Sequence, residues 1–334
     1  MKTWLLEGGY GLKNVVMKDI PQPQLRPNEV LVKVHALSLN QVDLLVINGI
    51  YQTTLPHQLG SNAAGIVVAT GDDVTCFRKD DQVVTLYSQT WESGPLQERD
   101  IRSRTGVFRP GVYAEYIAVP EEALLPIPET LTMEEASTLP IAAVTAWESL
   151  VGMGKLKAGQ TVLLQGTGGV SVFALQFAKA IGAKVIITSG SDHKLEKMKE
   201  LGADYTLNYR MQADWVQQVV ELTQGKGVDL AIEGVGIGLN NTMKAMKLNG
   251  RISVIGFMKG REAGMDILTL IQKRLTIKAI QGAGSKEAFR EMNRAIDANE
   301  IKPLIDKRYP FVQLKEALTQ LQSGNHVGKI VVTI

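Results

Sequence analysis

The stretch LLQGTGGVSVFALQFAKAIGAKVIITSGS, residues 163–191, decides the fold of this 334-residue chain. An apolar run at 161–165 predicts a buried strand. Apolar residues then recur every three or four positions over 170–181, which predicts a helix that ends at Gly182. A second apolar run follows at 184–188. Strand, turn, helix and strand in this order predict part of a parallel, doubly wound α/β sheet.

The glycine-rich turn between this strand and this helix is typical of a dinucleotide-binding site. Gly166 permits a tight turn, and Gly168 lets the backbone approach a pyrophosphate. The helix N-terminus, at Gly169 and Val170, offers backbone amides and the positive end of the helix dipole to that anion. Ser171 takes the place of a third glycine and is small enough to keep the helix close to the strand. The alternative is an ordinary packed turn, but the strand before it and the helix after it favour a dinucleotide.

The end of the second strand bears on which dinucleotide binds. A fold that prefers NAD places Asp or Glu there, about 20 residues beyond the glycines, to hold the ribose hydroxyls. This chain has Ser189, Gly190 and Ser191 instead, and Lys194 follows on the first turn of the next helix. The sequence therefore predicts NADP(H), with Lys194 beside the 2′-phosphate. Two alternatives stay open: Asp192 is the acid shifted by two residues, or Lys194 is a solvated helix lysine.

The pattern of the chain changes near residue 127. Earlier segments alternate apolar and polar residues over short runs, which predicts mainly β structure. Later segments alternate strand-length and helix-length patterns, and the tail after them is too short to be a domain. We therefore expect a mainly β domain, residues 1–126 with 285–334, and an inserted nucleotide-binding domain, residues 127–284. Its strands are expected at 161–165, 184–188, 228–232, 251–255 and 275–280.

Composition excludes several classes of function. Hydrophobic residues make up 45% of the chain and charged residues 21%, and the net charge of +2 is spread without basic blocks, so nucleic acid is not an expected partner. No apolar run approaches the roughly 20 residues of a membrane span, and we expect a cytoplasmic protein. The single cysteine, Cys76, excludes an internal disulfide and any site that needs two thiolates. The four histidines stand far apart, so the sequence offers no support for zinc.

Taken together, five segments resemble the medium-chain dehydrogenase/reductase superfamily, and within it the zinc-free quinone oxidoreductase-like branch. The resemblance covers nearly the whole chain. It implies a GroES-like catalytic domain, a Rossmann domain, a cofactor in the cleft between them, and a homodimer built on the last Rossmann strand, LTIKAI. The segments are EVLVKVHALSLNQVDLLVINGIY, LGSNAAGIVVATGDDV, GVYAEYIAVPEEALLPIPETLTMEEASTLPIAAVTAWESL, QGTGGVSVFALQFAKAIGA and HVGKIVVTI.

The resemblance also bears on metal and catalysis. Where zinc-dependent relatives place their metal ligands, this chain has Asn40, Ser61, Asn62 and Ile141, which predicts a zinc-independent enzyme. In zinc-free relatives an asparagine and a following tyrosine face the nicotinamide and the substrate, and these are Asn40 and Tyr51 here. The alternatives are a turn residue that bonds its own backbone for Asn40 and a half-buried packing residue for Tyr51. Asp43 is expected to be structural.

Further residues are expected at the cofactor. By resemblance, Thr145 contacts the ribose or nicotinamide, Tyr209 lies with Lys194 at the adenosine phosphate, and Lys329 is a weaker candidate for the same phosphate. Thr145 has the alternative of a helix-interior residue. A last group lies at carboxyl ends of predicted strands, where doubly wound sheets bind ligands, although turns alone would explain it: Gly234, Gly236, Gly256 and Phe257.

These features predict an NADPH-dependent oxidoreductase that transfers hydride to a quinone or an α,β-unsaturated carbonyl compound without zinc. The substrate is expected to be a small carbonyl or quinone molecule, and the Asn40 amide and Tyr51 hydroxyl are the expected donors to its oxygen. Two alternatives are an alcohol or aldehyde oxidoreductase of the same superfamily and a catalytically idle, crystallin-like NADPH-binding protein.

Overall fold

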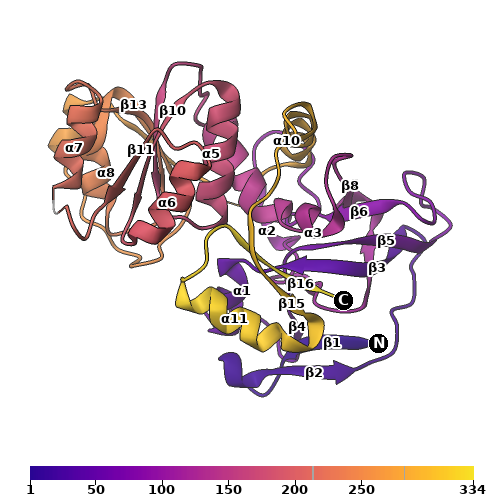
Figure 1. Ribbon diagram of the computed structural model, residues 1–334. Coiled ribbons are helices and arrows are strands. Elements are labelled where there is room, and N and C mark those ends of the chain that lie inside the picture. The colour runs from indigo at the N-terminus through magenta and orange to yellow at the C-terminus, as the bar shows by residue number, and fades with distance from the viewer. Residues whose placement is uncertain (213, 282) are drawn as a thin grey trace. The chain divides into compact units, whose positions relative to one another are not determined.

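The computed structural model describes residues 1–212, 214–281 and 283–334, which form two compact units (Figure 1). Unit 1 contains residues 1–144 and the C-terminal segment to residue 334, and unit 2 lies within residues 145–281. The prediction of an α/β fold with a mainly β part and an inserted parallel-sheet part is confirmed.

The boundary between unit 1 and unit 2 lies between residues 144 and 145, later in the chain than the change of sequence pattern near residue 127. Residues between these points pack on the sheet of unit 1: the Ser38 hydroxyl donates to the Ser137 carbonyl at 2.8 Å, and the Asn62 amide donates to the same oxygen at 3.3 Å. Local periodicity shows a helical segment but not the sheet that it covers, so the units divide between residues 144 and 145.

Unit 2 is built on a six-stranded parallel sheet in the order β11-β10-β9-β12-β13-β14. The chain starts in the middle at β9, runs outward through β10 and β11, and then continues on the other side of β9. The carboxyl ends of β9 and β12 therefore flank the switch point where such sheets bind ligands. The strands are β9 (Thr161–Gln165), β10 (Lys184–Ser189), β11 (Tyr205–Asn208), β12 (Val228–Glu233), β13 (Met246–Val254) and β14 (Thr276–Ala279).

The five strands predicted for this sheet are present, and β11 is an addition. It is short, with two polar residues and a tyrosine among its four, so no apolar run marks it. Figure 1 shows α5 and α6 on one side of the sheet and α7 and α8 on the other. The helical segments are α4 (Val144–Trp147), η4 (Glu148–Gly152), α5 (Gly169–Ile181), α6 (Asp192–Glu200), α7 (Trp215–Leu222), α8 (Leu239–Ala245) and α9 (Ile267–Gln272).

Helix α5 keeps the predicted apolar period and is anchored by aromatic packing. Phe173 and Phe177 are fully buried, with their rings stacked at 6.0 Å between centroids, and Trp147 meets Phe177 edge to face at 5.4 Å. The helix ends at Gly182, whose φ of 86° is the left-handed conformation expected for this position. The N-terminus of α5 is thereby fixed at the end of β9.

Unit 1 contains two sheets. A seven-stranded sheet runs in the order β15-β16-β3-β5-β6-β8, with β7 also paired to β3, and a smaller sheet has the order β2-β1-β4. The strands are β1 (Lys2–Leu6), β2 (Val15–Asp19), β3 (Glu29–Ser38), β4 (His57–Gln58), β5 (Ala63–Thr70), β6 (Gln82–Thr85), β7 (Tyr116–Pro120), β8 (Leu124–Pro126), β15 (Ile305–Pro310) and β16 (Lys329–Thr333).

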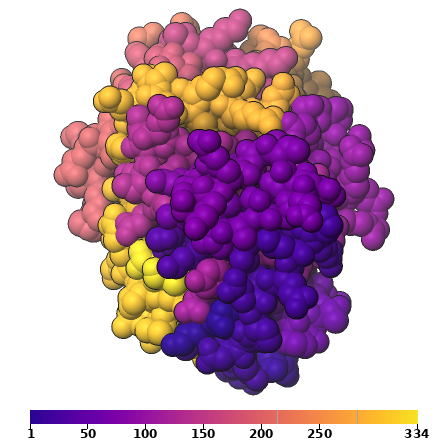
Figure 2. Space-filling view, turned by 90° about the vertical axis from the view of Figure 1, so that its right-hand side faces the viewer, coloured from indigo at the N-terminus to yellow at the C-terminus, as the bar shows by residue number. Residues whose placement is uncertain are grey.

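The C-terminal segment completes this unit, as the sequence predicts. Strand β16 pairs antiparallel with β3, with Val331 opposite Ser38, and Figure 2 shows C-terminal residues in yellow beside indigo N-terminal ones. Helix α10 buries the predicted face of Phe289, Met292 and Ile296. The helical segments are η1 (Leu12–Asn14), α1 (Gln41–Ile47), α2 (Glu98–Arg102), η2 (Glu121–Ala123), α3 (Met133–Ala136), η3 (Leu139–Ala143), α10 (Lys286–Ala298), η5 (Phe311–Gln313) and α11 (Leu314–Ser323). Among the residues described, no helix is long and apolar enough to cross a membrane.

Candidate functional site

The glycine turn of unit 2 has the geometry of an anion-binding site. Gly166 adopts a φ of 77°, and a Cβ added at Gly166 or Gly168 would meet no atom within 4 Å. Helix α5 begins directly after, and Gly168 at its N-cap has no side chain that would cover the first amides. Open space in front of uncapped amides, Gly169 and Val170 among them, suits a pyrophosphate. These residues therefore fit a dinucleotide.

A buried carboxylate shapes the neighbouring turn after β12. Glu233 is fully buried and accepts hydrogen bonds from the amides of Val235 and Gly236, at 2.8 and 3.1 Å. It also accepts from the Gln165 side chain at 2.8 Å, which ties the end of β12 to the end of β9. A Cβ at Gly236 would lie 2.2 Å from the Gly260 carbonyl oxygen, so this predicted cofactor glycine is required by protein packing alone.

The other predicted strand-end residues lie close to this turn. Gly234 follows β12 and Gly256 follows β13, and a Cβ at Gly256 would lie 3.2 Å from the Gly234 carbonyl oxygen. The Phe257 ring is partly exposed, and Arg261 stacks over it at 5.6 Å. Thr145 is buried in α4. These positions place backbone and one aromatic ring at the carboxyl edge of the sheet.

The corner after β10 brings predicted and unpredicted residues together. A Cβ at Gly190 would lie 2.9 Å from the Tyr209 hydroxyl and 2.7 Å from Arg210 Nε. Lys259 Nζ lies 5.2 Å from the centre of the Tyr209 ring. Lys194 occupies the first turn of α6 after Ser191. The corner is thus rich in cations, and Arg210 and Lys259 were not among the predicted site residues.

Asp192, the alternative acid for an NAD ribose, is engaged within the protein. Its carboxylate accepts a hydrogen bond from the Asn208 side-chain amide at 2.7 Å. Ser191 is the N-cap residue of α6, but its side chain makes no capping hydrogen bond. The carboxylate is therefore tied to the end of β11, which supports the interpretation of Asp192 as a structural first-turn residue.

Unit 1 contains a buried polar cluster around Asn40, the N-cap residue of α1. The Asn40 side-chain amide donates to the Ser61 hydroxyl at 3.1 Å and, more weakly, to the Ser38 carbonyl at 3.4 Å. Its oxygen Oδ1 accepts from Lys329 Nζ at 2.6 Å. The structure thus brings together Asn40 and Lys329, which the sequence assigned to different parts of the site. Lys329 Nζ also donates to the Leu39 carbonyl at 2.5 Å.

Two ionisable groups of this cluster are strongly affected by burial. Burial lowers the pKa of Lys329 to about 7, and the charge of Asp43 opposes that shift. Burial raises the pKa of Asp43, while hydrogen bonds from the Asn40 backbone amide at 2.7 Å and the Tyr113 hydroxyl at 2.8 Å favour its ionised form. Asp43 is therefore a structural residue that fixes the start of α1, as predicted.

Tyr51 follows α1 and is half-buried. Its backbone amide donates to the Leu45 carbonyl at 3.3 Å. The phenol of Tyr87 is buried: burial raises the pKa of Tyr87, Arg104 lowers it, and Tyr51 and Asp43 raise it further. Tyr51 and Asp43 therefore both interact electrostatically with the Tyr87 phenol.

The donor set at the positions of the zinc ligands does not fit a zinc ion. Ser61 and Asn62 are hydroxyl and amide side chains, and both take part in hydrogen bonds within unit 1. Lys329 places an ammonium group on the oxygen of Asn40, where a dication would be repelled. No group of three or more His, Cys, Asp or Glu suited to a metal occurs in the described part of the chain. Zinc sites use thiolate, imidazole and carboxylate ligands.

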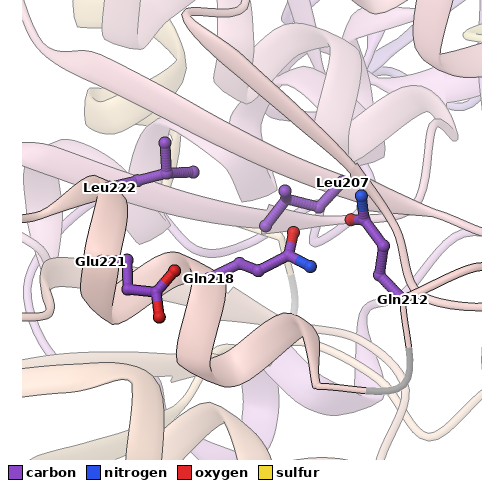
Figure 3. A pocket seen from close by; sticks show the side chains of 5 residues that line it. All are labelled: Leu207, Gln212, Gln218, Glu221 and Leu222. Carbon is purple, nitrogen blue, oxygen red and sulfur yellow. The ribbon is translucent and has the colours of Figure 1, made fainter.

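A surface hollow in unit 2 is lined by five residues outside the predicted set. Figure 3 shows that it is formed by α7 and the end of β11, with amide and carboxylate side chains at its wall. Leu207, Gln212, Gln218, Glu221 and Leu222 line it, and none is a predicted site residue.

Sequence reasoning missed four residues at these sites. Arg210 directly follows Tyr209 and could have been found by extending the motif by one position. Glu233 directly precedes Gly234, the first of the two predicted glycines after β12, and could have been found in the same way. Lys259 and Arg104 carry no local signal, because their positions depend on contacts between distant segments.

Two family models match the chain. The alcohol dehydrogenase GroES-like domain matches residues 26–129, and the zinc-binding dehydrogenase model matches residues 169–298. Among curated relatives, a zinc-type alcohol dehydrogenase-like protein of Schizosaccharomyces pombe is 41% identical over 95% of this chain and 93% of its own. The human quinone oxidoreductase is 28% identical over 95% of this chain and 92% of its own.

Solved structures agree over the full length of the chain. A structure titled as a putative alcohol dehydrogenase from Sinorhizobium meliloti has a TM-score of 0.94 at 37% identity and covers 100% of this chain and 98% of its own. An NAD-dependent alcohol dehydrogenase has a TM-score of 0.89 at 31% identity, and a mycobacterial protein complexed with NADPH has 0.85 at 26%. Both alignments cover 100% of each chain.

Proposed function

The chain belongs to the medium-chain dehydrogenase/reductase superfamily, and we propose that it is an NADPH-dependent reductase of quinones or α,β-unsaturated carbonyl compounds that works without zinc. The observation that carries this proposal is the cluster around Asn40, where amide and hydroxyl side chains stand at positions of zinc ligands in relatives and Lys329 Nζ donates to the Asn40 oxygen. The open glycine turn before α5 supports the nicotinamide dinucleotide.

The chemistry requires a dinucleotide and a stabilised oxygen. When bound, the dihydronicotinamide supplies a hydride, and with one proton from solvent it reduces the double bond of an enone or converts a quinone into a hydroquinone. Negative charge gathers on the carbonyl oxygen during this transfer. An activated acceptor needs no strong base, whereas a saturated alcohol must lose its hydroxyl proton and is normally activated by a metal.

The chain's own donors meet that charge. Lys329 Nζ donates to Asn40 Oδ1, so the Asn40 side-chain nitrogen points away from Lys329. That nitrogen makes a long contact of 3.4 Å with the Ser38 carbonyl, and a substrate oxygen would replace this contact. The Tyr51 hydroxyl would provide the second donor. Donors aimed at such an oxygen contribute about 2.7 to 4 kcal/mol each in other enzymes. Lys329 is a positioning residue for Asn40.

Steady-state kinetics with NADPH and a panel of quinones, enones and aldehydes test this function. We expect Asn40→Ala and Tyr51→Phe each to lower kcat/KM for the best acceptor about 100-fold, since each removes a donor worth about 2.7 kcal/mol or more. Tyr116→Phe on β7 is the matched control and should keep the wild-type value. Losses below twofold for both variants would refute the site. If the protein oxidises simple alcohols with NADP⁺ but turns over no quinone or enone, the alcohol dehydrogenase alternative is favoured. If it turns over none of these compounds, the idle binding protein is favoured.

We propose NADP(H) as the cofactor, held at its 2′-phosphate by the corner after β10. Lys194 and Tyr209 contribute there, and the position of Arg210 Nε beside Gly190 adds a guanidinium. A charge-assisted phosphate contact is worth roughly 1.5 to 3 kcal/mol. Lys194→Ala should therefore weaken NADPH about tenfold or more and leave NADH nearly unchanged, as measured by fluorescence titration. Lys199→Ala, at the end of the same helix, is the control, and an equal loss for both cofactors would contradict the assignment.

We also propose a homodimer, with a second copy at β14. This strand ends the sheet of unit 2 and its side chains are largely exposed. Helix α9 adds Ile267, Leu268 and Ile271, which are 54%, 63% and 66% exposed. Analytical ultracentrifugation should give the mass of a dimer for the wild type and that of a monomer for Leu268→Glu with Ile271→Glu. A wild-type monomer at micromolar concentration would exclude this dimer.

A further inference from the structure

Arg104 is a buried cation of unit 1 that the reaction proposed above does not use. It follows α2, and its backbone forms an isolated antiparallel β-bridge with Ser88. Its carbonyl oxygen accepts hydrogen bonds from the amides of Val107, Phe108 and Arg109, at 3.3, 3.1 and 3.0 Å. Only 3% of the residue is exposed. The backbone therefore holds this arginine in one place, with its side chain inside the unit.

One edge of the Arg104 guanidinium has no partner. The nitrogens Nε and Nη2 are both buried, and neither has a hydrogen-bond partner within residues 1–212, 214–281 and 283–334. These two atoms form the side edge of a guanidinium, which binds a carboxylate through two parallel hydrogen bonds. Arg104 Cζ lies over the Tyr87 ring, 5.7 Å from its centre, which is a cation–π distance. A buried charge with unpaired donors is costly unless a ligand completes it.

The loop that carries Arg104 contacts the Asn40 cluster. Gly106 packs on Gly60 and Ser61, since a Cβ there would lie 2.3 Å from the Gly60 oxygen and 3.4 Å from the Ser61 amide nitrogen. Ser61 in turn accepts the hydrogen bond from the Asn40 amide. Arg104, Tyr51 and Asp43 all act electrostatically on Tyr87. The segment that carries Arg104 therefore adjoins the Asn40 cluster through the contact of Gly106 with Ser61.

The charges of this cluster favour an anion. Asp43 is a carboxylate of this cluster, and it accepts hydrogen bonds from the Asn40 backbone amide at 2.7 Å and the Tyr113 hydroxyl at 2.8 Å. Lys329, which donates to Asn40, and Arg104 are both buried basic side chains. We propose that Arg104 binds, through Nε and Nη2, the carboxylate of an anionic carbonyl substrate such as an unsaturated keto acid. The identity of the substrate as an electron acceptor rests on the reductase function proposed above.

A probe that cannot be turned over tests the binding site by itself. 4-Oxopentanoate carries a ketone and a carboxylate, and its methyl ester is the matched neutral compound. Isothermal titration calorimetry with the full chain, with and without NADP⁺, should show at least tenfold tighter binding of the acid than of the ester. Arg104→Met should abolish this difference, and Arg104→Lys, which keeps the charge but loses the fork, should retain only part of it. Arg102→Met removes an exposed arginine of the same segment, paired with Glu98, and should change nothing.

Turnover provides the second measurement. With NADPH, trans-4-oxopent-2-enoate and its methyl ester present the same enone with and without the carboxylate. We expect Arg104→Met to lower kcat/KM for the acid at least tenfold and to keep the value for the ester within twofold.

The outcomes separate this inference from the proposed function. Equal binding of acid and ester by the wild type would overturn the carboxylate site, and so would inorganic phosphate that displaces 4-oxopentanoate at equal or lower concentration, since the site would then take any oxyanion. Binding of the acid that depends on Arg104, without reduction of any acceptor, would support the site and refute the reductase. If Arg104→Met does not fold, the ratio of acid to ester in the wild type and in Arg104→Lys decides.

Discussion

The candidate sites of the two units are built from different parts of the chain. In unit 2 the predicted cofactor site consists of backbone groups. Gly166 and Gly168 leave open space, and the backbone amides at the start of α5 border that space. In unit 1 the candidate substrate cluster consists of side chains, and the bond between Lys329 and Asn40 joins residues 289 positions apart. A backbone site needs only glycines at fixed spacing, whereas a side-chain cluster depends on the tertiary fold. Substitutions should therefore act differently in the two units.

The largest effect is expected at the backbone site. Gly168→Val should raise the Kd of NADPH more than 100-fold, because its side chain would fill the space in which the pyrophosphate lies. The fold should tolerate it, since Gly168 has a φ of −77° and a Cβ there meets no atom within 4 Å. Fluorescence titration and urea unfolding measure the two effects, and the free energy of unfolding should change by less than about 0.5 kcal/mol.

Gly236→Val is the matched contrast in the same unit. Its Cβ would clash with the Gly260 carbonyl oxygen at 2.2 Å, and its φ of 89° is strained for any other residue. We expect a loss of stability of about 2 kcal/mol or more. Should Gly168→Val unfold the protein while Gly236→Val leaves it stable, the assignment of open and packed glycines would be reversed.

A smaller effect is expected from the buried lysine of the side-chain cluster. The pKa of Lys329 in the folded protein is about 7, below its ordinary 10.5, so between these pH values the unfolded chain holds a proton that the folded chain lacks. Stability should therefore rise with pH through this window, by about 2 kcal/mol between pH 7 and pH 9. Lys329→Met should remove this rise in urea unfolding, and Lys307→Met on β15 should keep it. Identical pH dependence in wild type and Lys329→Met would show that Lys329 does not titrate there.

The same contrast explains what could be predicted from the sequence. The order of strands and helices in unit 2, the turn before α5 and the return of the C-terminal strand to unit 1 all follow from local periodicity and glycine spacing. Asn40 and Tyr51 are predicted from the family resemblance, but the contact of Asn40 with Lys329 is not, because no local pattern pairs the N-cap of α1 with a residue of β16. Arg104 has no local signal either, because the segment that carries it is placed by the packing of Gly106 on Gly60 and Ser61. Sequence thus identifies backbone sites and leaves the electrostatics of side-chain clusters to the structure.

The smallest effect on activity and stability is expected from treatment with a metal chelator. This treatment tests whether the side-chain cluster occupies the place of a zinc site. A family model that matches this chain is described as a zinc-binding dehydrogenase, yet the four ligand positions hold Asn40, Ser61, Asn62 and Ile141. The Lys329 ammonium on Asn40 Oδ1 repels a dication, and Ser61 and Asn62 are engaged in hydrogen bonds with neighbours. We therefore expect less than about 0.1 zinc per chain by elemental analysis, and unchanged kcat/KM and unfolding midpoint after prolonged dialysis against a chelator. The reductase proposal would have to be abandoned in its zinc-independent form if one zinc per chain survived purification and activity was lost with its removal and restored by its return.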